Sequence, residues 1–580
     1  MSNVKTSATH IALYCFCILN MLVMHIGIVT KCDTEFGLNW VSWVDNLCGI
    51  VIDVTVLFLF ALFITWGKTK LSIATTFIIT SIWAFCNIVY SRFFHSYITL
   101  SSIEQSSSLT DPIVLKSTLL GLQWQDLYFV LSPIIFTILY IRTKNTIKVK
   151  RSCVTAFIFM ITLITTSITA HAIDCIINPD YRYLTYFSNR LFSRHISRHF
   201  AICSPITTTF HRGTIRMLGL DIYDKMKGPE ELSDSQKAII TQAIKESQGS
   251  MVNVQQETSN YQNIIFIIVE SYMAFTSDMI VDGKEITPNL NALKHDSTVY
   301  YNGHVQPNIT IGESSDGQFI YMTGLLPLRS MITISKARKR NLPGLPKVLS
   351  PQGLTSIMII PTQPTLWNQV EMCQRYGFDK LYSSNDIKGE HDLNLNDQQV
   401  FDFASSKDIL PTISKNSFSV ILTMSMHQPY IEPTDPSFYI QDSSLSEELK
   451  NYLNTCHYTD KHIGKFLDKL KQTGCYEKSL IIITADHHVH STDFGQKYTH
   501  DLPLYIINSG IDSKTAWHGN CNQIDVYTTL LDLIQPKTHY WGLGHSLLSS
   551  SYKNSMNNIK WDISEWILQS DYFKLKMQNN

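Results

Sequence analysis

Long apolar runs dominate the first third of the chain, and a mixture of polar and apolar segments follows them. Five of these runs reach or approach the roughly 20 apolar residues that a helix needs to cross a bilayer. They lie at residues 10–30, 47–66, 71–91, 127–141 and 153–177. A cleaved signal peptide would explain the first run alone, but five runs in succession predict a five-helix transmembrane domain over residues 1–177.

The loops between these runs predict the orientation of the domain. "GKTK" (67–70) and "RTKNTIKVKR" (142–151) are basic, and the second holds five basic residues and no acid. Because basic loops stay on the cytoplasmic side, we expect the N-terminus in the cytoplasm. An odd number of spans then places everything after residue 177 outside the plasma (inner) membrane.

A basic, aromatic segment follows the fifth run. In "YRYLTYFSNRLFSRHISRHF", Arg190, Arg194 and Arg198 recur every four residues, while aromatic and aliphatic residues fill another face of the helix. This pattern fits a helix on the membrane surface, and it also fits a helix packed against the soluble domain. With the polar stretch 228–260, it predicts amphipathic and linker helices over residues 178–260.

From residue 263 onward, apolar strands alternate with amphipathic helices. Five near-continuous apolar runs lie at 263–270, 355–361, 417–425, 479–486 and 502–509. Helical patterns between and after them cover 287–296, 366–376, 443–472 and 522–534. Such runs suit strands buried on both faces of a sheet. The alternation predicts an α/β sandwich with a mostly parallel sheet over residues 261–555, followed by a C-terminal tail, 556–580.

Composition narrows the classes of partner. The chain has 47 basic and 48 acidic residues, so its net charge indicates no nucleic-acid partner. The part after the spans has five widely spaced cysteines, which allow one disulfide but do not indicate a disulfide framework. They are Cys203, Cys373, Cys456, Cys475 and Cys521.

Polar residues follow three of the predicted strands at the edge where α/β sheets bind ligands. Glu270 ends the first strand, Asp486 and His487 end the fourth, and His427 follows the third. A carboxylate after a buried strand is costly unless it is paired or binds a metal. Glu270 alone would also fit a helix cap, "DHH" a hydrogen-bonded turn and His427 a satisfied histidine. Together they point to a shared cation.

Two adjacent serines, Ser314 and Ser315 in "IGESSDGQF", precede a segment compatible with a helix. The N-terminus of a helix favours anions, and a coordinated metal can activate a serine hydroxyl without a histidine base. Either serine could equally be an N-cap. Position alone leaves the two interpretations open.

Residues 263–546 resemble the extracellular domain of lipoteichoic acid synthases and related phosphoglycerol transferases, in the alkaline phosphatase/sulfatase superfamily. The resemblance rests on motifs in the family's order and spacing, and the five spans also match. These motifs are "NIIFIIVESY", "ITPNLNALKHDSTVYYNGHV", "GESSDGQFIYMTGLLPL", "LWNQVEMCQRYGFDKLY", "TMSMHQPY", "IIITADHH" and "NQIDVYTTLLDLI" with "YWGLGHSLL".

The resemblance implies a role for each matching residue. Glu270, Asp486 and His487 would hold one divalent metal, Mn²⁺ or Mg²⁺ with Zn²⁺ as a possibility, and Ser314 would be both the nucleophile and the remaining ligand. The expected substrate-binding residues are His427, Trp367 and, from the phosphoethanolamine transferase branch, His500. Two positions depart from the family. Gln369 stands where an arginine is expected, and "IIPTQPT" lacks a histidine, so the resemblance specifies the reaction more closely than the substrate.

The resulting hypothesis is a membrane-anchored transferase. It would move a phospholipid headgroup, phosphoglycerol or phosphoethanolamine, onto a cell-envelope glycan or glycolipid through a phosphoserine intermediate. A superfamily hydrolase, a phosphatase or phosphodiesterase, is the alternative. A sulfatase would need x-Pro-x-Arg after the nucleophile, and "SDGQ" follows Ser314 instead. A second alternative is a non-catalytic membrane sensor or scaffold, which the loss of a metal ligand would favour.

Overall fold

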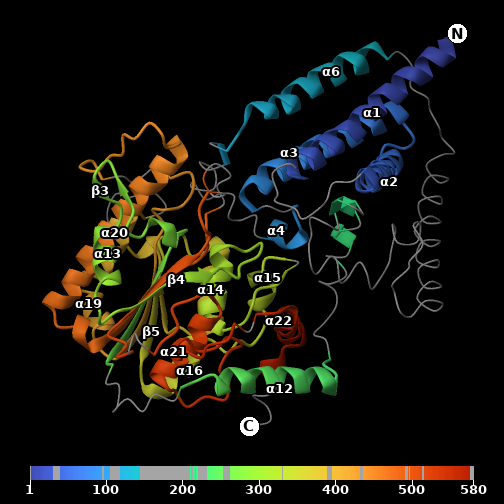
Figure 1. Ribbon diagram of the computed structural model, residues 1–580. Helices are drawn as coiled ribbons and strands as arrows, with labels where there is room; N and C mark the ends of the chain where they lie inside the picture. The colour runs from blue at the N-terminus through green and yellow to red at the C-terminus, as the bar shows by residue number, and fades with distance from the viewer. Residues whose placement is uncertain are drawn as a thin grey trace. The chain divides into compact units, whose positions relative to one another are not determined.

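In the computed structural model of the chain (Figure 1), the apolar runs form long helices. They are α1 (Ser2–Val29), α2 (Trp40–Ile64), α3 (Thr69–Phe94) and α6 (Tyr128–Arg142). Three segments are long and apolar enough to cross a membrane, at Thr9–Val29, Thr69–Arg92 and Trp124–Arg142, and Gly49–Ile64 is a shorter apolar helix. These correspond to the first four predicted spans. The fifth, at 153–177, and the basic segment 181–200 lie outside the described residues.

The chain divides into two compact units. The N-terminal unit holds residues 1–103, 118–228 and 329–331, and the C-terminal unit holds 104–117, 229–328 and 332–580. The structure describes residues 2–29, 40–94, 97–104, 118–119, 121–143, 209–210, 213–215, 217–219, 222, 231–252, 261–329, 331–387, 395–430, 435–489, 494, 497–511, 515–554 and 556–574.

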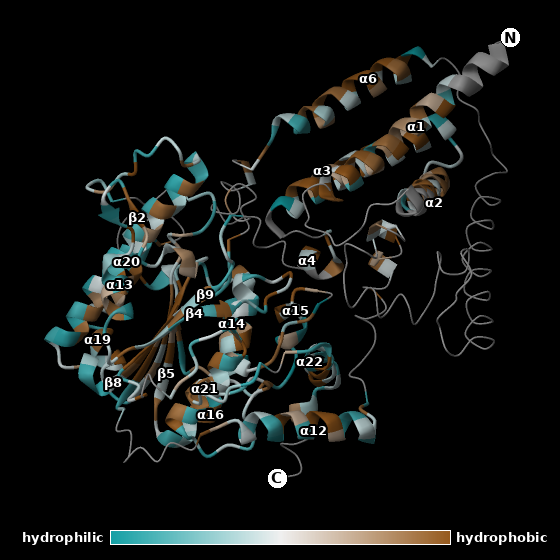
Figure 2. Cartoon of the chain, in the orientation of Figure 1, coloured by the Kyte–Doolittle hydropathy of each residue, from teal (hydrophilic) through white to brown (hydrophobic). Residues whose placement is uncertain are grey.

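Side chains on α1 separate into an inner and an outer face. Leu13, Cys17, Met21, Met24 and Ile28, three or four residues apart, are fully or almost fully buried. Outward residues of α1 such as Ile11, Leu19 and Ile26 are apolar as well, which suits a lipid environment, and the described parts of α1, α3 and α6 are mostly hydrophobic (Figure 2). Polar contacts join the helices, since the amide of Asn20 donates to Thr80 and Ser81.

Two contacts show that α3 and α6 run antiparallel. At one end, Lys70 Nζ donates to the carbonyl of Thr143 at 2.9 Å. At the other, the guanidinium of Arg92 binds both carboxylate oxygens of Asp126 at 2.8 and 2.6 Å. The beginning of α3 and the end of α6 therefore lie at the same end of the helical unit.

The C-terminal unit is built on an eight-stranded sheet with the order β10-β4-β9-β8-β1-β7-β5-β6. Its strands are β1 (Asn263–Val269), β4 (Tyr300–Gln306), β5 (Thr355–Ile359), β6 (Lys380–Tyr382), β7 (Ser417–Leu422), β8 (Ser479–Ala485), β9 (Leu502–Ile507) and β10 (Cys521–Asn522). All five predicted strands are present. The sheet is mostly parallel, but β9 runs antiparallel to both β8 and β4.

Helices cover both faces of this sheet (Figure 1). On one side lie α13 (Pro288–Lys294) and α20 (Glu447–Gln472), and on the other α14 (Ser314–Thr323) and α21 (Asp525–Ile534). The ring of Tyr321 on α14 packs 5.2 Å from that of Phe266 on β1, so α14 lies directly on the central strands. This arrangement agrees with the predicted α/β sandwich.

Two helices outside the predicted 261–555 domain also belong to the C-terminal unit. The segment expected as a tail contains α22 (Asn558–Ser570), whose Ser564 accepts a hydrogen bond from the main chain of Leu326. The helix α12 (Asp234–Gly249) contacts the same unit through Ser247, which donates to the carbonyl of Trp541. The described cysteines of this unit are free buried thiols. They are Cys373, Cys456, Cys475 and Cys521.

Candidate metal centre and nucleophile

Two neighbouring parallel strands end at the same height and bring three ligand-type side chains together. Val269 on β1 is in register with Ala485 on β8, so the residues that follow them emerge side by side. Ligand atoms of Glu270, Asp486 and His487 lie within 4.8 Å of one another. The three residues are 5, 3 and 4 % exposed. Burial of this kind is costly for charged groups unless they share a compensating charge.

Hydrogen bonds hold the two carboxylates in place. The main-chain N–H groups of Ser271 and His487 both donate to Asp486 Oδ1, at 2.9 and 2.8 Å. Ser271 Oγ donates to Glu270 Oε1 at 2.9 Å, and the main chain of Glu270 donates to Thr423 Oγ1. One oxygen of each carboxylate is therefore fixed by the protein.

The imidazole of His487 is oriented through its other nitrogen. Nδ1 lies 2.7 Å from the carbonyl of His488, which can only accept, so Nδ1 carries a hydrogen. This bond directs Nε2 to Glu270 Oε1 at 3.3 Å and Asp486 Oδ2 at 3.6 Å. Nδ1 anchored on a carbonyl with Nε2 turned to a ligand is the common arrangement for metal-binding histidines.

The two buried carboxylates of the cluster favour a positive charge beside them. Burial raises the pKa of Asp486 to about 7, and the nearby Glu270 carboxylate adds to the rise. Burial also opposes ionisation of Glu270, but its hydrogen bond and attraction to His487 outweigh this and lower its pKa to about 2. Burial disfavours the His487 imidazolium, yet the two carboxylates raise its pKa well above the usual value.

The donor set fits one divalent cation. Two carboxylates, an imidazole nitrogen and a nearby hydroxyl provide the mixed oxygen and nitrogen ligands that Mn²⁺, Mg²⁺ and Zn²⁺ accept. A cation between them would take over the charge compensation that the His487 proton provides.

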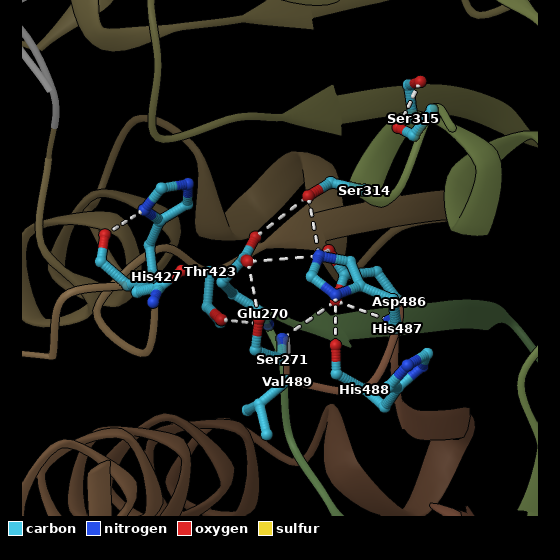
Figure 3. Close-up of polar contacts among 12 residues, drawn as sticks. Glu270, Ser271, Ser314, Ser315, Thr423, His427, Asp486, His487, His488 and Val489 are labelled. Carbon is cyan, nitrogen blue, oxygen red and sulfur yellow. Dashed lines mark hydrogen bonds and ion pairs between the residues drawn. The ribbon is translucent and has the colours of Figure 1, made fainter. Parts of the chain in front are cut away.

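The two serines of "ESSD" have different environments (Figure 3). Ser314 Oγ lies 3.0 Å from His487 Nε2 and donates to Glu270 Oε2 at 3.3 Å. Ser315 Oγ is turned away and donates to the carbonyl of Gly312 at 2.7 Å, and the residue is only 2 % exposed. The geometry brings Ser314, and not Ser315, to the carboxylate cluster.

Ser314 is the first residue of α14, as expected, but the helix N-terminus differs from the predicted anion site. The N–H groups of Ser315, Asp316 and Gly317 donate to the carbonyls of Gly312 and Glu313. These donors are already engaged within the turn, so they do not point at a ligand. At the N-terminus of α14, the helix dipole is therefore the part of the predicted attraction for anions that these N–H groups leave in place.

His427 lies beside the cluster (Figure 3). His427 is half-buried, its charge helps to lower the pKa of Glu270, and its Nδ1 bonds to the carbonyl of Gln428 at 2.6 Å. Trp367 is half-buried and has a positive φ of 51°. His500 precedes β9 and stacks on His488, with ring centroids 4.7 Å apart. Since β9 is antiparallel to β8, its beginning lies at the edge where β8 ends.

Gln369, which stands where an arginine is expected, is 4 % exposed, and its amide donates to Gln318 Oε1 on α14 at 2.9 Å. A neutral amide pair therefore occupies this position, beside the helix that carries Ser314.

Sequence reasoning missed a carboxylate that holds the loop before Ser314. Asp316 Oδ2 accepts from the N–H and hydroxyl of Thr310 and from the N–H of Gly312, at 2.9, 2.7 and 3.0 Å. Its place two residues after Ser314 in "ESSD" was the available signal, because Asp side chains often bind nearby main-chain N–H groups.

Comparison with models of protein families gives two matches. A model described as the lipoteichoic acid synthase N-terminal domain matches residues 1–199, and a model described as sulfatase matches residues 262–536. Together they cover most of the chain.

The chain is also similar to individual proteins of known sequence or structure. The chain is 25% identical to lipoteichoic acid synthase 2 of Bacillus subtilis (strain 168), over 90% of this chain and 82% of the relative. Among solved structures, the lipoteichoic acid synthase LtaP of Listeria monocytogenes is 19% identical, with a TM-score of 0.48, covering 57% of this chain and 98% of that chain. The Streptococcus pyogenes phosphoglycerol transferase GacH, in complex with sn-glycerol-1-phosphate, is 19% identical, with a TM-score of 0.43, covering 60% of this chain and 94% of that chain.

Proposed function

Because the chain belongs to the lipoteichoic acid synthase-like proteins of the alkaline phosphatase/sulfatase superfamily, and is therefore a phosphotransferase, we propose that it transfers phosphoglycerol from a membrane phospholipid to an envelope glycan or glycolipid. Phosphoethanolamine is the other headgroup to test. The observation that carries the proposal is the approach of Ser314 Oγ to the buried Glu270, Asp486 and His487 cluster.

Members of the superfamily depend on metals, and in this chain Glu270, Asp486, His487 and Ser314 would hold the cation. A bound divalent cation supplies a lower pKa for the serine hydroxyl and charge stabilisation for a phosphoryl oxygen. The chain's own residues orient these groups: His488 aligns the His487 imidazole, and Ser271 fixes both carboxylates.

The proposed reaction has two displacements at phosphorus. In the first, Ser314 Oγ loses its proton and bonds to the phosphorus of the donor, while the bond from phosphorus to the diacylglycerol oxygen breaks. Diacylglycerol leaves after taking up a proton, and the headgroup remains as a phosphodiester on Ser314. In the second, an acceptor hydroxyl gives up its proton and bonds to phosphorus while the bond from phosphorus to Ser314 Oγ breaks, and the serine oxygen takes up a proton to restore its hydroxyl.

His427 is assigned to the substrate. Its Nδ1 binds the carbonyl of Gln428, so Nε2 is the nitrogen available to a phosphoryl oxygen or to the leaving oxygen. Trp367 and His500 are assigned to the headgroup and phosphate. These roles rest on the sequence resemblance, with His427 also supported by its electrostatic effect on Glu270.

The membrane helices would keep the enzyme next to its donor. We assign the basic loops to the cytoplasmic side and the C-terminal unit to the outside, where an envelope acceptor is found. The contact between Lys70 and the Thr143 carbonyl supports this topology, since it places the beginning of α3 and the end of α6 on one side.

Mass spectrometry of the intact protein tests the proposal. Full-length protein in detergent micelles is incubated with phosphatidylglycerol or phosphatidylethanolamine and Mn²⁺, and the peptide containing Ser314 is examined. We expect a phosphoglycerol adduct on the wild type and on Ser315→Ala, and none on Ser314→Ala. Released headgroup phosphate with no adduct and no transfer to an acceptor would instead indicate a hydrolase.

A further inference from the structure

Gln523, in the segment "NQIDV", has a buried side-chain amide. It lies between the end of β8, which carries two of the candidate metal ligands, and the loop that leads to Ser314. Gln523 follows β10 and precedes α21, and it is fully buried. Its main-chain N–H donates to the carbonyl of Gln306 at 2.9 Å, which continues the pairing of β10 with β4. The side chain thus starts from a fixed position in the sheet.

The side chain of Gln523 bridges two separate main-chain segments. Nε2 donates to the carbonyl of Asp486 at 2.7 Å, and Oε1 accepts from the N–H of Asn308 at 3.0 Å. Asn308 reciprocates, because its Oδ1 accepts from the N–H of Ile524 at 3.1 Å. These two partners are main-chain atoms of fixed polarity, so one end of the amide must donate and the other must accept. The side chain of Tyr321 on α14 also interacts with the Gln523 amide.

Each bridged segment leads directly to a functional group. The carbonyl held by Nε2 belongs to Asp486, whose side chain is a candidate metal ligand. The segment held by Oε1 begins the loop from Asn308 to Ser314, which Asp316 holds further along at Thr310 and Gly312. The amide therefore links the end of β8 to the loop that carries the nucleophile.

We propose that Gln523 is a positioning residue that sets the spacing between the hydroxyl of Ser314 and the metal ligands at the end of β8. The proposal rests on the function proposed above. Gln523 acts through main-chain atoms, since its side chain hydrogen-bonds to the N–H of Asn308 and the carbonyl of Asp486 and not to a ligand atom. Residues that hydrogen-bond the ligating side chains themselves affect metal affinity or activity by about 10–100-fold. Because Gln523 holds the main chain of a ligand, we expect an effect at the lower end of that range.

Two variants of full-length protein test this role. Gln523→Met keeps the length of the side chain and removes both hydrogen bonds. Gln523→Glu keeps the acceptor for Asn308 but turns a carboxylate oxygen toward the carbonyl of Asp486. We expect both to weaken Mn²⁺ binding, measured by calorimetry, by about tenfold and to shift the visible absorption of the Co²⁺-loaded protein. We also expect kcat to fall while KM for the donor changes little.

Thr529→Val is the matched control. Thr529 is equally buried and lies on α21, where its hydroxyl donates to the carbonyl of Asp525 and accepts from the N–H of Leu547. We expect this variant to lower Tm and to leave Mn²⁺ affinity and the Co²⁺ spectrum unchanged.

The outcomes separate this inference from the proposed function. Wild-type Mn²⁺ affinity and Co²⁺ spectra in both Gln523 variants would overturn the positioning role, whatever the transfer assay shows. Failure of both variants to fold would also overturn it, because Gln523 would then serve the stability of the fold. If the wild type binds no divalent cation, the metal assignment fails instead.

Discussion

At the scale of single residues, the two adjacent serines differ in their contacts rather than in their chemistry. The hydroxyl of Ser315 donates to the carbonyl of Gly312, whereas the hydroxyl of Ser314 lies close to Glu270 and His487. The residue pattern indicated this pair and the three ligand-type residues, and the family resemblance selected Ser314. The choice depends on where α14 begins and on the turn before it, which only the folded chain defines.

The protonation of the cluster predicts how metal binding depends on pH. Burial raises the pKa of Asp486 to about 7, and the carboxylates overcome burial to raise that of His487, so a cation must displace protons to bind. As pH falls through about 7, protons compete more strongly. We therefore expect the apparent Mn²⁺ affinity to decrease on acidification, measured by calorimetry between about pH 8 and pH 6. An affinity that is constant over this range would contradict the assignment.

At the scale of elements, the strands that could be predicted are those with continuous apolar runs. β1, β7 and β8 are buried along their whole length, so apolar residues lie on both of their faces. β4 was missed because its burial is interrupted by half-buried and exposed residues. The antiparallel direction of β9 could not be predicted either, because an apolar run such as "LPLYII" has the same pattern in a parallel and in an antiparallel strand.

The close packing of α14 against the end of β8 predicts the effect of a substitution at Gly317. A Cβ added to Gly317 would lie 2.3 Å from the carbonyl oxygen of Asp486, so Gly317→Ala must move the helix or the strand end. We expect a loss of about 1–3 kcal/mol in the free energy of unfolding. We also expect a larger relative loss of kcat, because Ser314 and the ligands separate. Chemical denaturation and transfer assays measure the two effects.

Gly249→Ala is the control for this substitution. A Cβ at Gly249, the last residue of α12, meets no atom within 4 Å. Stability and kcat close to those of the wild type are expected there. Equal behaviour of the two alanine variants would contradict the steric argument.

At the scale of the whole molecule, the described residues of the candidate site all belong to the C-terminal unit. We therefore expect a fragment of residues 229–580 to fold and to bind Mn²⁺ with the affinity of the full chain, as shown by circular dichroism and calorimetry. Its transfer from lipid vesicles should fall by about 100-fold, because it no longer benefits from the effective concentration that membrane attachment gives. A fragment as active on vesicles as the full chain would show that the helices do not serve this purpose.

The orientation of the helical unit can be tested on the intact protein. Single cysteines placed at residues 68 and 143, in a chain whose native cysteines are replaced, should both be labelled by impermeant reagents only from the cytoplasmic side. Labelling of the two from opposite sides would contradict the contact between Lys70 and Thr143.

The antiparallel direction of β9 also has a consequence for the connection between His488 and His500, which follows the candidate metal ligands Asp486 and His487. Because β8 ends and β9 begins at the same edge of the sheet, the pairing of these two strands does not require a fixed number of residues between His488 and His500. Insertions or deletions there would change the surroundings of His488 and His500 without disturbing the layers beneath. The enzyme thus has a stretch in which substrate preference could diversify while the reacting groups stay in place.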